Sequence, residues 1–176
     1  MKTNIGIGDS VLNTLRTVRE ELLNEVASLS DNQLNMKPSE EKWSVSQVIQ
    51  HLSAIDESLL PALKNAVKDE SERVEEKDVK FVLDRTKKRE SPLPEPSAEF
   101  ISKEGILKML NQARIPLIEF TNENIDGTIL EDKSMVHPFL GQMSIKQMIE
   151  VIALHEKRHI DQVKEIKESI VSQKMI

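Results

Sequence analysis

Apolar residues recur at steps of three and four positions in four separate stretches of the chain. The first stretch covers residues 9–29, where Val11, Leu15, Val18 and Leu22 fall on one side of a helix. This spacing is typical of an amphipathic α-helix that packs one face against a core. We therefore predict a first helix here, followed by a polar connection.

Two further stretches begin at residues that favour helix starts. Ser44 and Gln47 have the S-x-x-Q spacing of a capping box, which predicts a second helix running to about residue 68. Pro61 lies inside this stretch and is expected to bend the helix or end it early. Ser102 is the expected cap of a third helix, in which Pro116 predicts a kink.

The last stretch has the most regular pattern. Ser144 and Gln147 repeat the capping-box spacing, and the apolar stripe continues to about residue 169. Four amphipathic helices predict an all-α fold, a four-helix bundle in which the apolar faces meet in one core. A chain of 176 residues is roughly the length of one domain, so we expect residues 1–176 to form a single domain.

The connection between the second and third helices, residues 69–101, is long for a compact domain. It is rich in charge and then in proline, with a short apolar piece near Phe81 that has the length of one helical turn. A connection of this length can cross a bundle from end to end, so helices two and three need not be antiparallel neighbours. A lid over a site is an alternative role that the sequence does not decide.

Composition removes several classes of function. The chain has no cysteine, which excludes a disulfide framework, a thiolate metal site and an internal sulfur nucleophile. A net charge of -6, without a basic run interleaved with aromatics, argues against nucleic acid and anionic membranes as partners. No apolar run has the length of a signal peptide or a membrane span. We therefore expect a cytoplasmic protein whose partners are small molecules or other proteins.

Three of the four histidines lie on predicted core stripes. His155 and His159 are four positions apart on the last helix, so their side chains stack on one face, about 6 Å apart along the axis. His51 occupies a core position of the second helix. Three inward imidazoles at one depth are costly to bury alone, and one metal ion satisfies them all. We therefore predict a metal site, with nitrogen ligands that suit zinc, nickel, copper or iron.

Each histidine also has a simpler interpretation. A single histidine on an apolar stripe is usually an ordinary core or boundary residue, and this alternative is strongest for His51 taken alone. His137 precedes a proline in the connection HPFLG, so we expect it to be an exposed loop residue outside the metal site.

The segment from His155 to His159 also reads H-E-x-x-H, the motif of zinc metalloproteases. The following residues, IDQVKEIKES, contain neither the glycine nor the third ligand of such proteases, and no strand-rich stretch is present to hold an extended peptide. We therefore reject a protease. Glu156 lies about 100° around the helix from His155, beside the ion, where it could orient a metal-bound water as a catalytic residue. The alternative is an ordinary charge on the helix flank.

Three motifs together resemble a known family. The segments WSVSQVIQHL at 43–52, HPFLG at 137–141 and HEKRHI at 155–160 are similar in order and spacing to the DinB-like superfamily, which includes the YfiT-type proteins. The likeness covers essentially the whole chain. It implies a bundle of up-down-down-up topology and a three-histidine metal site, which maps onto His51, His155 and His159 and commonly holds zinc or nickel.

The resemblance also implies an activity. Family members with an assigned activity are largely transferases and isomerases that use low-molecular-weight thiols such as bacillithiol, mycothiol or glutathione, and dimers are common. We therefore expect a metal-dependent enzyme in which a thiol at the open coordination position attacks a small electrophile, or a related hydrolysis by water. The alternatives are a non-catalytic binding or stress-response module that the metal stabilises, and a helical scaffold without metal.

Overall fold

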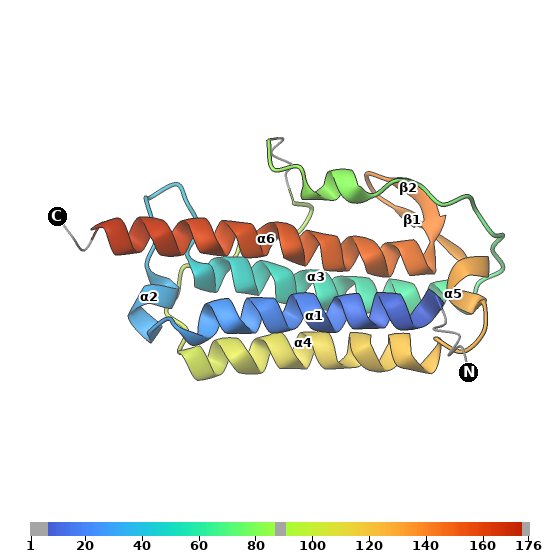
Figure 1. Ribbon diagram of the computed structural model, residues 1–176, viewed down its shortest axis with the longest axis horizontal. Coiled ribbons are helices and arrows are strands. Elements are labelled where there is room, and N and C mark those ends of the chain that lie inside the picture. The colour runs from blue at the N-terminus through green and yellow to red at the C-terminus, as the bar shows by residue number, and fades with distance from the viewer. Residues whose placement is uncertain (1–6, 87–90, 174–176) are drawn as a thin grey trace, which may run out of the picture.

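The computed structural model describes residues 7–86 and 91–173 of the chain. Four long helices lie side by side and form a bundle (Figure 1), which confirms the predicted architecture: α1 (Ile7–Ala27), α3 (Val45–Ala66), α4 (Lys103–Glu123) and α6 (Ile145–Gln173). α1 packs mainly on α6, and α3 packs on both α4 and α6. No helix in the described part of the chain has the length and apolar character needed to cross a membrane.

The core is built from the apolar stripes of all four helices. Leu15, Ile49, Leu110 and Ile149 come from different helices, and each is completely buried. Removing one such side chain from water contributes about 1.5–3 kcal/mol. The stripes that the sequence predicts therefore meet in one hydrophobic cluster along the bundle axis.

Two predicted caps start their helices as expected. The Ser44 hydroxyl accepts a hydrogen bond from the Gln47 backbone N–H, and the Gln47 side chain accepts one from the Ser44 N–H. The capping box of α3 is therefore complete. The Ser102 hydroxyl accepts from the N–H of Gly105 at the start of α4.

The second predicted capping box is only half formed. The Ser144 hydroxyl accepts from the backbone N–H of Gln147. The side-chain amide of Gln147 turns away from Ser144 and bonds both the N–H and the carbonyl of Lys77. Gln147, which was expected to complete the capping box of α6, therefore attaches the long connection to α6.

Both prolines inside predicted helices are accommodated. α3 continues through Pro61 to Ala66, and α4 continues through Pro116 to Glu123. The early end considered for the second helix at Pro61 is therefore not found, because the helix runs on for another turn. A kink at Pro116 stays a prediction.

Short elements occupy the connections. α2 (Asp31–Asn35) follows α1, and η1 (Lys80–Leu83), a single 3-10 turn, forms at the apolar piece near Phe81 where one helical turn was expected. α2 was not predicted, although the Ser30 hydroxyl and the Gln33 side chain form a complete capping box before it. The S-x-x-Q spacing that identified α3 was therefore present here as well.

A small hairpin precedes the last helix. α5 (Ile129–Asp132) leads into β1 (Ser134–His137), which pairs antiparallel with β2 (Gly141–Ser144). Gly141, opposite His137 in the register, has a φ of 71°, a left-handed conformation that glycine adopts without steric cost. The sequence predicted only a connection here, because strands of four residues carry too little alternation to be recognised.

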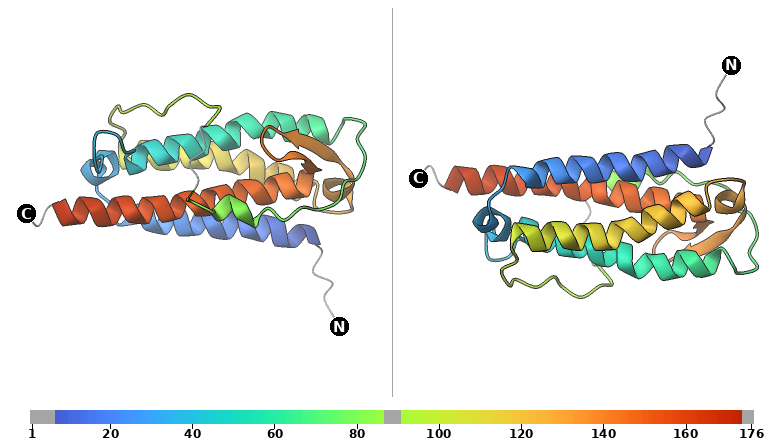
Figure 2. Two further views of the ribbon diagram at one scale, coloured as in Figure 1. Left: turned by 90° about the horizontal axis from the view of Figure 1, so that it is seen from above. Right: turned by 90° about the horizontal axis from the view of Figure 1, so that it is seen from below.

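The described parts of residues 67–102, between α3 and α4, lie against α6 and then against α3 (Figure 2). η1 packs on α6, where the Arg158 guanidinium donates to the backbone carbonyls of Val82 and Asp84. Farther along, the Gln50 side chain of α3 exchanges two hydrogen bonds, of 2.9 and 3.1 Å, with the backbone of Ser97. The connection is thus attached to both helices that carry the predicted metal ligands.

Candidate metal centre

α3 and α6 bring three histidines together. His51 comes from α3, and His155 and His159 come from successive turns of α6. The Nε2 atom of His155 lies 3.4 Å from Nε2 of His51 and 3.2 Å from Nε2 of His159. One nitrogen from each ring lies within 4.8 Å of the other two. The structure therefore places all three predicted ligands in one group, called here the three-histidine cluster.

The spacing of these nitrogens fits a single ion. Imidazole nitrogens lie about 2.0–2.1 Å from zinc, so two of them in a tetrahedral site are about 3.4 Å apart. Both measured separations are close to this value. Hydrogen bonding between the rings explains only one of these two short distances. Nε2 of a neutral His155 has either one hydrogen or one lone pair, so it can bond one of the other two rings but not both. The donor set thus suits a divalent metal better than mutual hydrogen bonding.

Gln162 determines which nitrogen of His159 is available. The Nδ1 atom of His159 lies 2.7 Å from the amide oxygen of Gln162, which can only accept a hydrogen bond. Nδ1 therefore carries the hydrogen, and Nε2 presents its lone pair to the other histidines. A hydrogen bond to the ring nitrogen that does not bind the metal orients the ligand ring and raises its basicity.

Burial holds the three rings in their neutral form. Desolvation lowers the pKa of His51 and lowers the pKa of His159 to about 3. The pKa of His155 lies well below its usual value because burial is reinforced by the neighbouring His159 and His51. Neutral imidazole is the form that binds metal, so no proton has to leave these rings near neutral pH.

A cavity of about 990 Å³ opens onto the three-histidine cluster. His51, His155 and His159 all line it, so an ion held by them would be accessible from the cavity. The other walls come from the long connection, with Phe81, and from the hairpin, with Phe139. Three protein ligands and one accessible position are the arrangement of catalytic zinc sites, whereas structural sites are closed by four.

His137 lines the same cavity, which the sequence analysis did not anticipate. The residue is half-buried at the end of β1, so the expectation of an exposed loop residue is wrong. Its Nδ1 atom accepts hydrogen bonds from the backbone N–H groups of Phe139 and Leu140, at 3.1 and 3.2 Å. The hydrogen of a neutral His137 ring is therefore on Nε2.

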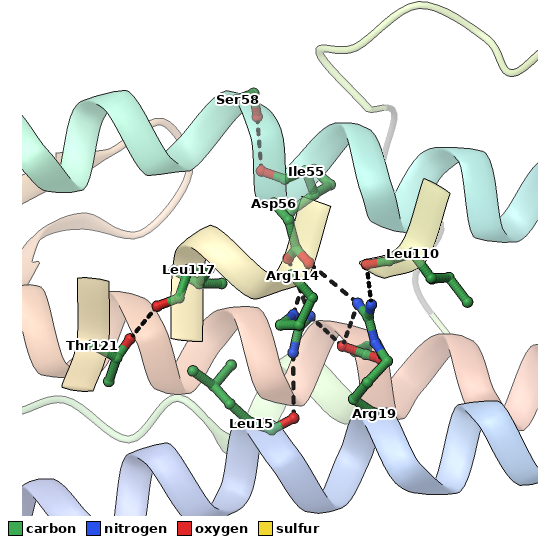
Figure 3. Close-up of polar contacts among 10 residues, drawn as sticks. Leu15, Arg19, Ile55, Asp56, Ser58, Leu110, Arg114, Leu117 and Thr121 are labelled. Carbon is green, nitrogen blue, oxygen red and sulfur yellow. Dashed lines mark hydrogen bonds and ion pairs between the residues drawn. The ribbon is translucent and has the colours of Figure 1, made fainter. Parts of the chain in front are cut away.

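One charged residue from each long helix contributes to a buried group of ion pairs (Figure 3). This four-charge cluster consists of Arg19 on α1, Asp56 on α3, Arg114 on α4 and Glu156 on α6, with side chains at most 8% exposed. Arg19 donates to Glu156 at 2.7 Å and to Asp56 at 3.2 Å. Arg114 donates to Asp56 at 2.8 Å and also bonds Glu156. Two positive and two negative charges balance in the interior.

Glu156, the one candidate catalytic residue of the sequence analysis, belongs to this cluster. It is completely buried, and its carboxylate oxygens accept hydrogen bonds from Arg19 and Arg114. The structure thus brings together the three predicted metal ligands and gives Glu156 two arginine partners, one position along the helix from His155. Its direct role in catalysis stays a prediction.

The arginines of the four-charge cluster were missed by the sequence analysis. Arg19 is four positions after Leu15 and Arg114 is four positions after Leu110, so each stands on the apolar stripe of its helix. Burial lowers the pKa of Arg114, but the carboxylates of Glu156 and Asp56 raise it by more, and the guanidinium stays charged. A charged residue on an apolar stripe is unusual, and this feature of the sequence could have indicated that the two arginines are buried with partners.

Residues 14–163 match the family model of the DinB superfamily. The chain belongs to the DinB superfamily. It is 40% identical over 156 residues to the uncharacterized protein YuaE of Bacillus subtilis, a match that covers 86% of this chain and 94% of YuaE. It is 24% identical over 154 residues to the Oceanobacillus iheyensis protein named “Putative metal-dependent hydrolase OB0413”, covering 87% of this chain and 81% of that protein.

Two solved structures share the fold of this DinB-superfamily protein. YfiT from Bacillus subtilis, described as “a probable metal-dependent hydrolase with an unusual four-helix bundle topology”, matches with a TM-score of 0.66 and 17% identity, over 97% of this chain and 92% of YfiT. TT2238, described as a four-helix bundle protein, matches with a TM-score of 0.59 and 18% identity, over 90% of this chain and 98% of TT2238.

Proposed function

We propose that this DinB-superfamily protein is a metal-dependent enzyme that activates water or a low-molecular-weight thiol for attack on a small electrophile. The observation that carries the proposal is the three-histidine cluster, His51, His155 and His159, lining a cavity of about 990 Å³. A divalent ion, with zinc or nickel as the first candidates, supplies Lewis acidity when bound and lowers the pKa of water or a thiol.

The chain's own residues have distinct roles in this proposal. The three histidines hold the ion through their Nε2 atoms, and Gln162 keeps the ring of His159 in the required orientation. Arg158 and Arg85 attach η1 and the residues after it to α6, which keeps a wall of the cavity in place. A substrate enters from the cavity, which all three histidines line.

Two nucleophiles are compatible with this site. Hydrolysis is supported by the names of OB0413 and YfiT, both of which refer to metal-dependent hydrolases. Transfer of a low-molecular-weight thiol, which the family resemblance implies, is supported by the absence of cysteine, because a sulfur nucleophile has to come from outside the chain. A non-catalytic module stabilised by the metal is the second candidate, supported by the ion pairs that already engage Asp56 and Glu156.

The finer features of the family are part of the same proposal. In support of the up-down-down-up topology and its long connection, α3 and α4 both begin at the end of the bundle that carries α2, and residues 67–102 separate them (Figure 1). We further propose a single domain over residues 1–176, a cytoplasmic location and a homodimer, with neither nucleic acid nor membrane as a partner.

Activity assays of the zinc- and nickel-loaded protein test the proposal. We expect turnover either of activated esters, or of a thiol with an electrophile such as a chlorinated nitroarene, and at least a hundredfold loss in His159→Ala. Equal turnover by His159→Ala would overturn the assignment of activity to this site. One metal per chain without turnover of either substrate class supports the non-catalytic module.

A further inference from the structure

Two exposed aromatic side chains belong to the cavity above the three-histidine cluster. Phe81 of η1 is 44% exposed and Phe139 of the hairpin turn is 58% exposed. Both line the cavity, although they lie on segments far apart in the sequence that pack over the same helix, α6. Large apolar side chains that gather around a concave site are typical of ligand contact.

Much of the remaining wall is apolar as well. α3 and the residue before its cap contribute Trp43, Ile55 and Leu59, and the long connection contributes Leu93. The volume of about 990 Å³ lies at the upper end of the range, about 300–1,000 Å³, of small-molecule sites. The cavity therefore has room for an apolar group well beyond a methyl or an ethyl.

Two arginines of the cavity are engaged by the protein itself. Arg85 holds Glu165 with two parallel hydrogen bonds of 2.6 and 2.7 Å, the bidentate geometry of a strong ion pair. Arg158 donates to backbone carbonyls of the connection. These two side chains therefore hold the cavity wall in place.

The apolar wall reaches the three-histidine cluster directly. His51 packs against Trp43, with the two ring centroids 5.4 Å apart. A ligand at the metal position therefore lies beside a largely apolar surface. This combination favours a molecule with a reactive polar group and an apolar body.

We infer that the substrate of this site carries a sizeable aliphatic or aromatic body, and that Phe81 and Phe139 determine this preference. The inference rests on the proposed function for the chemistry at the histidines. The apolar body lies along the aromatic wall while its reactive group faces the three-histidine cluster.

A series of p-nitrophenyl esters tests the preference in the zinc-loaded full-length protein. We expect kcat/KM to rise by about two- to fourfold for each added methylene from acetate to hexanoate, as apolar burial predicts. Phe81→Ala and Phe139→Ala should flatten the chain-length series, whereas Phe100→Ala, which is 61% exposed outside the cavity, should leave it unchanged.

An equilibrium measurement separates this inference from the proposed catalysis. The uncharged fluorescent probe N-phenyl-1-naphthylamine should bind the wild-type protein and Phe100→Ala equally tightly, and Phe81→Ala and Phe139→Ala at least fivefold more weakly. Probe binding with this pattern but no ester turnover supports the apolar site and overturns hydrolysis. Probe affinity that neither phenylalanine variant changes overturns the inference.

Discussion

Arg19 on α1 and Glu156 on α6, 137 positions apart in the chain, form a buried ion pair with an Nε–Oε1 distance of 2.7 Å. The pair lies one residue from His155 and joins the helix of two predicted ligands to a helix that contributes none. Asp56 on α3, five positions after His51, likewise accepts a hydrogen bond from Arg114 on α4, a helix without a predicted ligand. Buried ion pairs therefore connect α3 and α6, the two helices that carry the predicted ligands, to α1 and α4.

Glu156→Gln is expected to lower the free energy of unfolding by about 3–5 kcal/mol, because Arg19 and Arg114 then share a single carboxylate in the interior. Urea denaturation measures the loss. Glu76→Gln is the matched control, since its bond to Lys146 is 3.2 Å long but its own side chain is 63% exposed, and it should cost about 0–1 kcal/mol. Equal losses in the two variants would contradict a structural role for the four-charge cluster.

The same variant also separates the two roles of Glu156. A positioning role predicts that metal affinity and stability fall together in Glu156→Gln. A loss of turnover with unchanged unfolding free energy and unchanged metal affinity would instead support the direct catalytic role predicted from the sequence.

His155→Ala is expected to abolish stoichiometric metal binding, since it removes the ring whose Nε2 lies within 3.4 Å of both other ligands. Elemental analysis after dialysis, and calorimetric titration with zinc, measure the effect. His137→Ala is the control, because His137 lines the cavity but is not in the three-histidine cluster. Full binding by His155→Ala would refute the assignment of the site.

Gln162→Ala should weaken metal binding by about 10- to 100-fold, which is the usual effect of removing a residue that hydrogen-bonds a metal ligand. The physical reason is the loss of the 2.7 Å hydrogen bond that keeps the hydrogen of His159 on Nδ1. Competition with a chromogenic chelator gives the two dissociation constants. Gln112→Ala, at an exposed position of α4, should bind as tightly as the wild type. If both variants bind equally tightly, Gln162 does not orient the ligand.

Acid is expected to destabilise the metal-free protein between pH 6.5 and 5. Burial lowers the pKa of all three clustered histidines, and that of His159 to about 3, whereas unfolded histidine titrates near 6.5. The unfolded state therefore binds more protons in this window. The free energy of unfolding decreases as the pH is lowered, by about 1.4 kcal/mol for each pH unit and each additional proton bound by the unfolded state.

Urea titrations at several pH values measure this slope with a chelator present throughout. His155→Ala removes one of the three titrating rings and should reduce the slope. A slope that is the same in both proteins would show that His155 is not held neutral by burial.

Helix geometry and local chemistry determine what the sequence alone could predict. The 3.6-residue period assigns an inward face to each long helix, and i, i+4 spacing stacks His155 on His159 in any such helix. Ser44 and Gln47 lie three residues apart and can form their capping box without the rest of the protein. Strands of four residues, by contrast, were below the length at which a pattern is visible, so the hairpin was missed.

Only the tertiary structure decided which inward faces meet. Apolar stripes are interchangeable, because burial is non-directional and any stripe can pack on any other. The pattern placed His51 and His155 on inward faces and predicted that they meet, but the 3.4 Å contact of their Nε2 atoms, 104 positions apart, depends on α3 packing on α6. The pairing of Arg19 with Glu156 was not predicted. The pattern also could not show that the side-chain amide of Gln147 bonds the backbone of Lys77 instead of the N–H of Ser144. The cavity arises in the same way, since its walls come from α3, α6, the long connection and the hairpin, which become neighbours only after the chain has folded.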